Sequence, residues 1–195
     1  MGDTRERILL TALHLFAAEG YEAVSVSDIA GALGMTKGAL YRHYKNKRDI
    51  FDSILDRMAR RDAEQAEQYQ VPGAEDGPSA PSPEQFAAYA RAMFRYWTGD
   101  DFAASFRRML TLEQYRSPEM GQLYQQYLAA GPMAYTAALL RDMGVPQPEA
   151  QAAAFYGAMF LLYSVCDAAQ DRPAALKLLD QCLDQFTEQW KGVGP

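Results

Sequence analysis

The stretch SVSDIAGALGMTKGALYRHYKNK, residues 25–47, decides the fold of the first part of the chain. Within it, Ser25 and Asp28 have the spacing of a capping box, which begins a helix. Gly34 is suited to end that short helix, and Thr36, two residues later, is suited to begin another. Two short helices joined by so tight a turn predict a helix-turn-helix unit.

Positive charge is concentrated in the second half of this stretch. Residues 35–47 hold four Lys or Arg and no acid, whereas the whole chain has a formal charge of −6. Residues 1–61 contain ten Lys or Arg against eight Asp or Glu, and residues 62–195 contain nine against seventeen. This asymmetry indicates that the first part of the chain meets a polyanion and that the remainder does not.

The second helix of the unit has the residues of a DNA-reading helix. Its N-terminus offers backbone N–H groups, and the small residues Gly38 and Ala39 allow the backbone to approach a base closely. Leu40 is expected to point inward as the apolar anchor. The alternative is a solvated basic surface, which the capped turn, the glycine and the interleaved aromatic residues disfavour. The side chains suited to a base edge or a phosphate are Lys37, Tyr41, Arg42, His43 and Lys47.

Residues 8–51, ILLTALHLFAAEGYEAVSVSDIAGALGMTKGALYRHYKNKRDIF, closely resemble the DNA-binding domain of the TetR/AcrR family of bacterial transcriptional regulators. The family's motifs occur in order: GY, a small capping residue, DIA, KGALY, HY and a lysine. Tyr44 stands where the family more often has phenylalanine. The DNA contacts that the resemblance implies are Thr36, Lys37, Gly38 and Ala39 in the major groove, Tyr41, Arg42, His43 and Lys47 at phosphates, and Ser25 and Ser27 from the preceding helix.

The same resemblance implies how the whole protein works. Family members are homodimers that bind palindromic operators on double-stranded DNA, and a small molecule in the C-terminal domain spreads the two DNA-reading helices and releases the DNA. We therefore expect a cytoplasmic, ligand-responsive transcriptional regulator, most often a repressor, and not an enzyme. Two alternatives stay open: a helix-turn-helix regulator controlled by a protein partner, and an enzyme that uses a C-terminal cavity.

The rest of the sequence predicts an all-α fold of about nine helices. Apolar residues recur at helical spacing, and no window alternates with the period of a strand. Residues 71–83 contain four prolines and two glycines and predict a loop or linker. We thus expect a helix-turn-helix domain at 1–47, a connecting helix at 48–70, and a helical effector-binding and dimerisation domain at 84–195.

Apolar residues on the last helix are spaced three and four apart, as in a helix–helix seam. The preceding helix contains the uncharged run 152–166, is apolar all round, and should be covered on two sides. Packing within one chain and a dimer interface are the two interpretations, and the resemblance favours the dimer. The expected interface residues are Phe160, Leu176, Leu179, Leu183, Phe186 and Trp190.

Residues 84–195 are also rich in tyrosine, other aromatic residues and methionine. Such side chains at helical spacing are usually core, but many buried tyrosine hydroxyls would each need a partner. This composition favours a cavity for a largely apolar, aromatic or cationic effector. Its expected lining is Met93, Trp97, Phe106, Met109, Tyr124, Tyr127, Phe155, Met159 and Tyr163. One helix of this region, residues 117–143, is expected to bend near Gly131.

No metal site and no cofactor are predicted. His14 and His43 lie far apart without nearby cysteines, and the common cofactor-binding and catalytic motifs do not occur. Cys166 and Cys182 are expected to be reduced, inert thiols. The longest uncharged run is too short for a membrane span and no leader is recognised, so neither secretion nor a membrane partner is expected.

Overall fold

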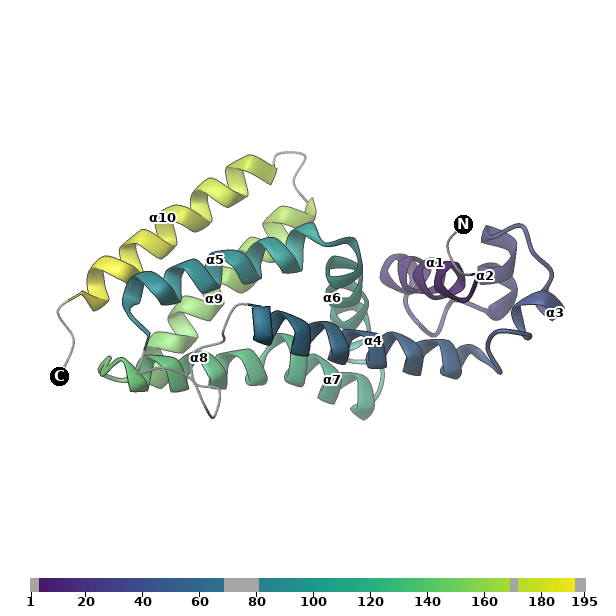
Figure 1. Ribbon diagram of the computed structural model, residues 1–195, viewed down its shortest axis with the longest axis horizontal. Coiled ribbons are helices and arrows are strands. Elements are labelled where there is room, and N and C mark those ends of the chain that lie inside the picture. Colours follow the sequence, from purple (N-terminus) through teal and green to yellow (C-terminus); the bar gives the residue numbers. More distant parts are fainter. Residues whose placement is uncertain (1–3, 69–80, 169–171, 192–195) are drawn as a thin grey trace. The chain divides into compact units, whose positions relative to one another are not determined.

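The computed structural model describes residues 4–68, 81–168 and 172–191, which are helical and contain no strand (Figure 1). The all-α fold is therefore confirmed. The helices are α1 (Thr4–Glu19), α2 (Val26–Ala32), α3 (Lys37–Leu40), α4 (Lys47–Gln68), α5 (Pro83–Gly99), α6 (Asp101–Glu113), α7 (Pro118–Leu128), α8 (Ala130–Asp142), α9 (Pro148–Ala168) and α10 (Arg172–Trp190).

The chain forms two compact units, and the first contains the helix-turn-helix. It comprises the described residues of 1–65 together with 101–124, so α6 and the start of α7 belong with the first four helices. Helix α6 lies against α1. Each large apolar side chain buried here stabilises the fold by about 1.5–3 kcal/mol. The fully buried members are Ile8, Leu13, Phe16, Ile29, Leu40, Ile50, Phe51, Ile54, Met58, Phe106, Met109 and Leu110.

One carboxylate in this unit is strongly affected by burial. Asp62 on α4 is half-buried, and desolvation raises its pKa to about 6. Because the folded chain then holds a proton on Asp62 more tightly than the unfolded chain does, stability falls as pH rises from about 4 through about 6. Above that window the ionised carboxylate opposes folding.

We therefore predict that Asp62→Asn stabilises the protein by about 1–2 kcal/mol at about pH 7.5, after allowance for partial solvent screening. The gain should shrink towards zero near pH 4, where the wild-type carboxyl is protonated in both states. Urea unfolding at several pH values measures it. Asp56→Asn removes the same charge from an exposed position on α4 and serves as the control. A gain that does not change with pH would contradict the assignment.

The second unit comprises the described residues of 66–100 and 125–191, and its core is aromatic. The rings of Phe94 and Tyr163 stack with centroids 5.1 Å apart, joining α5 to α9. Phe86, Phe155 and Trp190 form a second cluster, with the Phe86 ring 5.0 Å from Phe155 and 5.4 Å from Trp190. Such edge-to-face pairs add about 0.5–1.5 kcal/mol each beyond their buried area. Together they hold α5, α9 and α10 in one core.

The segment 117–143 is two helices and not the single bent helix expected. The break lies at Ala129, whose φ of −135° and ψ of −95° are not helical. A β-carbon on Gly131 would lie 2.2 Å from the carbonyl oxygen of Gln126, so only glycine allows the start of α8 to approach the end of α7 this closely. The expected bend is thus a complete interruption of the helix, two residues earlier.

The predicted linker 71–83 lies outside the described residues up to residue 80. Helix α5 then begins with a capping box, in which Ser82 Oγ accepts from the Gln85 amide at 3.2 Å and Gln85 Oε1 accepts from the Ser82 amide at 2.8 Å. The predicted domain boundaries stay a prediction. Among the described helices, none has the length and apolar character needed to cross a membrane. Residues 4–68, 81–168 and 172–191 contain no cluster of metal-ligating side chains.

Candidate nucleic-acid interface

Local hydrogen bonds fix the helix-turn-helix as the sequence predicts. Ser25 Oγ accepts from the Asp28 amide at 3.2 Å, and the Asp28 carboxylate accepts from the Ser25 amide at 2.8 Å. These two bonds begin α2, and the hydrogen bonds with Ser25 lower the pKa of Asp28. Thr36 Oγ1 accepts from the Ala39 amide at 3.2 Å and begins α3. Leu40 is fully buried, as expected of the anchor.

The outer side of α2 and α3 carries the predicted DNA contacts. Lys37, Gly38 and Arg42 are exposed, and the Tyr41 side chain is 44% exposed. A β-carbon on Gly38 would meet nothing within 4 Å, so the fold does not require glycine there. The Lys37 ammonium lies 5.8 Å from the centroid of the Tyr41 ring. We call this exposed set the reading surface; it consists of Ser27, Lys37, Gly38, Tyr41 and Arg42.

The remaining predicted contacts are less exposed or are already engaged within the chain. His43 and Ala39 are half-buried. Lys47 differs most from the prediction, because its ammonium donates to the Tyr21 carbonyl at 2.7 Å and lies 4.3 Å from the centroid of the Tyr21 ring. Its first role is therefore structural, and its contact with phosphate stays a prediction.

The support beneath α3 includes a contact that the sequence did not reveal. Tyr44 is buried, its hydroxyl donates to the backbone carbonyl of Arg5 at 3.3 Å, and the Arg5 guanidinium lies 4.9 Å from the ring centroid. Burial raises the pKa of Tyr44. The hydroxyl that distinguishes Tyr44 from phenylalanine thus connects the turn after α3 to the start of α1. The contact joins residues 39 positions apart, for which no local pattern exists.

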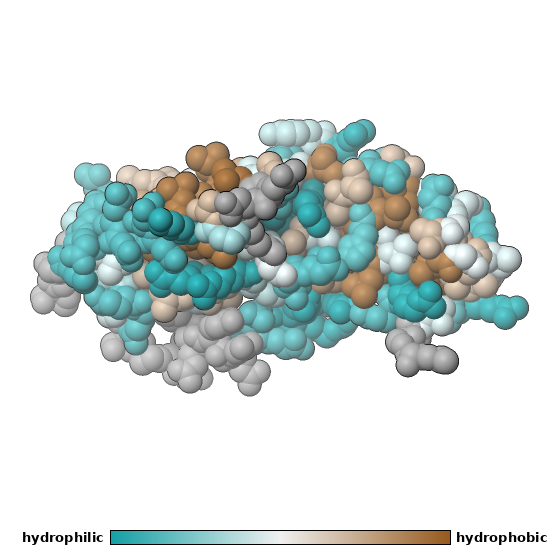
Figure 2. Space-filling view, turned by 90° about the horizontal axis from the view of Figure 1, so that it is seen from above, coloured by the Kyte–Doolittle hydropathy of each residue, from teal (hydrophilic) through white to brown (hydrophobic). Residues whose placement is uncertain are grey.

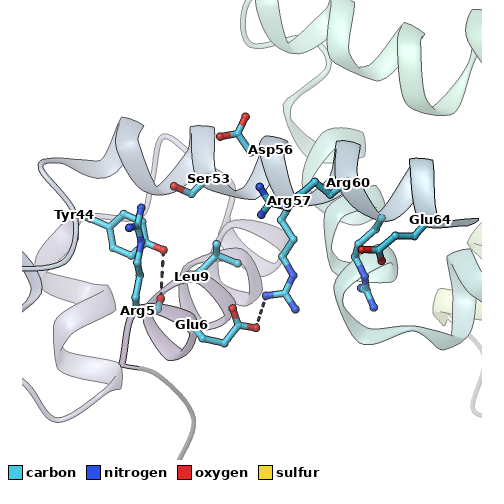
Figure 3. Close-up of a pocket in the computed structure, with 10 residues that line it drawn as sticks. Arg5, Glu6, Leu9, Tyr44, Ser53, Asp56, Arg57, Arg60 and Glu64 are labelled. Atoms are coloured by element: carbon cyan, nitrogen blue, oxygen red, sulfur yellow. Dashed lines mark hydrogen bonds and ion pairs between the residues drawn. The ribbon is translucent and has the colours of Figure 1, made fainter.

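A polar cleft of about 600 Å³ opens between α1 and α4 in the first unit (Figure 3). Glu6 of α1 and Arg57 of α4 form an ion pair in it. Since arginines and carboxylates make up most of its wall, it does not have the apolar character expected of the effector cavity. Its lining is Arg5, Glu6, Leu9, Tyr44, Ser53, Asp56, Arg57, Arg60, Arg61 and Glu64.

Comparison with known proteins agrees with this geometry. The sequence profile described as bacterial regulatory proteins, tetR family, matches residues 8–54, which include all of α2 and α3. Residues 8–54 are therefore a DNA-binding domain of the tetR-family type. It is 46% identical over 52 residues to the HTH-type transcriptional regulator AcrR of Shigella flexneri, and 44% identical over 55 residues to the HTH-type transcriptional repressor BepR of Brucella suis. The matched segments cover 27% and 28% of this chain.

The matched segment covers only 24% of the AcrR relative and 26% of the BepR relative, so these similarities concern the DNA-binding domain. Solved structures extend the likeness in fold to the whole chain. A TetR-family regulator from Bordetella parapertussis aligns over 95% of both chains with a TM-score of 0.67 and 18% identity. A transcriptional regulator from Aquifex aeolicus aligns over 94% of this chain and 99% of its own, with a TM-score of 0.66 and 19% identity.

The residues expected to line an effector cavity fall into both compact units. Phe106, Met109 and Tyr124 lie in the first unit, whereas the others lie in the second. Phe155, Met159 and Tyr163 are at least nine-tenths buried in the second core, with Met93, Trp97 and Tyr127 half-buried in the same unit. The two sets are therefore parts of two separate cores, and a shared cavity stays a prediction.

Three of the residues expected in the dimer seam are already buried within the chain, and the seam itself stays a prediction. Leu179, Leu183 and Trp190 are 1%, 1% and 3% exposed, because they pack inside the second unit against α5 and α9. Leu176, Phe160 and Phe186 are half-buried against the same core. The spacing of three and four therefore contributes at least in part to packing within the chain. The large apolar residues left exposed on the described parts of α9 and α10 are Leu161, Val165 and Leu178.

Proposed function

We propose that this TetR-family protein is a sequence-specific DNA-binding transcriptional repressor. The observation that carries the proposal is the reading surface: a capped, short α3 that exposes a lysine, a glycine with open space in front of it, a tyrosine and an arginine. Cations and hydroxyl groups of this kind bind phosphates, and a backbone without a side chain can approach base edges. The name of the BepR relative, a repressor, supports repression over activation.

The test is DNA binding by Lys37→Ala and Tyr41→Ala. Each substitution removes a group from the exposed side of α3 and is expected to weaken binding to the chain's own upstream DNA by about 10- to 100-fold. The fold should be intact because both side chains are exposed. Gel shifts with equal amounts of folded protein measure the effect, and Arg116→Ala, which removes an exposed cation from the turn after α6, is the control. Unchanged affinity in both variants would exclude α3 as the DNA-reading helix.

A homodimer is the second part of the proposal. Leu161 is 64% exposed, Val165 39% and Leu178 46%, and they lie on the neighbouring helices α9 and α10. Figure 2, seen from the side on which α10 lies in Figure 1, shows apolar surface in brown among polar residues. A twofold contact through this face would bury it and would carry two copies of α3, as a palindromic operator requires.

Control by a small molecule completes the proposal. The aromatic and methionine side chains of the second unit, from Met93 to Tyr163, suit a largely apolar or aromatic effector. The effector would bind better to a form in which the two reading surfaces are wrongly spaced for successive major grooves, so operator affinity would fall. The protein would act in the cytoplasm on double-stranded DNA. Control by a protein partner in place of a small molecule is the alternative.

A further inference from the structure

The turn between α1 and α2 is held from both sides of one residue. The Tyr21 amide donates to Glu113 Oε1 at 3.0 Å, and the Tyr21 carbonyl accepts from the Lys47 ammonium at 2.7 Å. The carboxylate comes from the last residue of α6, and the ammonium comes from the first residue of α4. Two charged side chains far apart in the sequence therefore fix the two peptide units on either side of the Tyr21 α-carbon, and charge-assisted hydrogen bonds of this kind are stronger than neutral ones.

Glu113 is placed with little freedom. It is 1% exposed, and its second oxygen, Oε2, is buried without a hydrogen-bond partner among the described residues. Its Oε1 lies so close to Gly20 that a β-carbon on that glycine would be only 2.5 Å away. Gly20 itself has a φ of +90°, a conformation that other residues rarely adopt. The residue that follows α1 is thus Gly20, whose missing side chain leaves space for the buried carboxylate of Glu113.

A buried carboxylate with an unpaired oxygen is unfavourable for stability, because burial removes its hydration. A gain in stability alone therefore does not explain the hydrogen bond between Tyr21 and Glu113. What it does accomplish is to fix the position of the Tyr21 backbone relative to α6. The half-buried Tyr21 ring packs against two core rings, 5.1 Å from the ring of Phe16 and 4.9 Å from that of Phe51.

The position of this turn determines the position of the DNA-reading helix. Only three residues separate Tyr21 from Ser25, which begins α2, and α2 packs against α3. Any displacement of the turn is therefore passed through a short, capped connection to the reading surface. A geometry held within a fraction of an ångström is what simultaneous contacts with bases and phosphates require.

We propose that Glu113 is a positioning residue for DNA recognition: its buried carboxylate, acting opposite Lys47, holds the Tyr21 turn and so sets the orientation of α2 and α3. The proposal rests on the proposed DNA-binding function. It makes the end of α6, which lies outside the helix-turn-helix in the sequence, a determinant of operator affinity. A movement of this end of α6 relative to α1 would release the turn and lower that affinity.

The test compares Glu113→Ala, Glu113→Gln and Leu110→Ala in the full-length chain. Glutamine keeps an acceptor for the Tyr21 amide, alanine removes it, and Leu110→Ala removes a fully buried side chain from the same helix without touching the turn. Two quantities are measured under conditions where urea titration shows each variant folded: hydrogen exchange of the Tyr21 amide, and affinity for the chain's upstream DNA. The first needs no DNA.

Glu113→Ala is expected to accelerate exchange of the Tyr21 amide by at least about tenfold and to weaken DNA binding by about tenfold, the effect of one hydrogen bond to a charged group. Glu113→Gln should restore both to within about threefold of the wild type. Leu110→Ala should lower stability while leaving DNA affinity unchanged.

Unchanged Tyr21 exchange in Glu113→Ala would overturn the proposal, as would an equal loss of DNA affinity in folded Leu110→Ala. A wild-type chain that binds no DNA would refute the proposed function and, with it, the link from Glu113 to operator affinity. The exchange result would then still decide separately whether Glu113 holds the turn.

Discussion

Replacing Gly38 by glutamate is expected to weaken DNA binding by at least about 100-fold, the equivalent of about 2.7 kcal/mol. The substitution places a bulky carboxylate on the exposed first turn of α3, where the proposal puts the DNA backbone and base edges. Like-charge repulsion and the loss of close approach both act against the complex.

The same substitution should leave the fold intact. Nothing lies within 4 Å of the β-carbon position of Gly38, and glutamate is a better helix former than glycine, with a charge that suits the start of a helix. Thermal unfolding should therefore show a stability equal to the wild type or higher by up to about 1 kcal/mol. Ala150→Glu adds the same charge at an exposed position on α9 and should leave DNA affinity unchanged. Equal affinity of Gly38→Glu and wild type would place the DNA on another surface.

The largest effect on stability is expected from Gly131→Ala. The added methyl group would lie 2.2 Å from the backbone oxygen of Gln126, and a backbone atom cannot move aside as a flexible side chain can. The start of α8 must then separate from the end of α7, at a cost of about 2–3 kcal/mol. Urea unfolding measures this cost.

The matched control is Gly157→Ala, the same chemical change in the same unit. Gly157 lies within α9 and has nothing within 4 Å of its β-carbon position, so alanine should stabilise the helix by about 0.5–1 kcal/mol. The two substitutions are thus expected to have opposite signs. A neutral result for Gly131→Ala would show that α7 and α8 approach one another less closely than described.

The local structure of the helix-turn-helix could be predicted from sequence because short-range hydrogen bonds determine it. The Ser25 and Thr36 caps each join residues three apart, and the buried position of Leu40 follows from helical spacing. These are the features that sequence patterns record directly. The exposure of the reading-surface residues follows from these local features.

The contacts that support the reading surface could not be predicted. The bond from Tyr21 to Glu113 joins residues 92 positions apart, and the bond from Tyr44 to Arg5 joins residues 39 apart. Neither leaves a periodic signal. The phosphate contact of Lys47 is predicted from its charge and from the family resemblance, and neither predicts that its ammonium donates to the Tyr21 carbonyl.

The spacing of apolar residues on α10 leaves open which chain its apolar face contacts. A spacing of three and four predicts that one face of α10 is apolar, but it does not indicate whether that face contacts the same chain or another. Leu179 and Leu183 meet the same chain. The separation of α7 from α8 also escaped prediction, since the approach of Gly131 to Gln126 depends on how two helices meet.

The central claim is that the exposed side of α3 reads DNA in a sequence-specific manner as part of a dimer. Selection of duplexes from a random DNA pool by the wild-type chain, followed by sedimentation of the selected complex, tests it most directly. We expect an enriched palindrome, two chains per duplex, affinity that falls steeply with salt, and no enrichment by Lys37→Ala. Failure of the wild-type chain to enrich any sequence, or equal enrichment by Lys37→Ala, would contradict it.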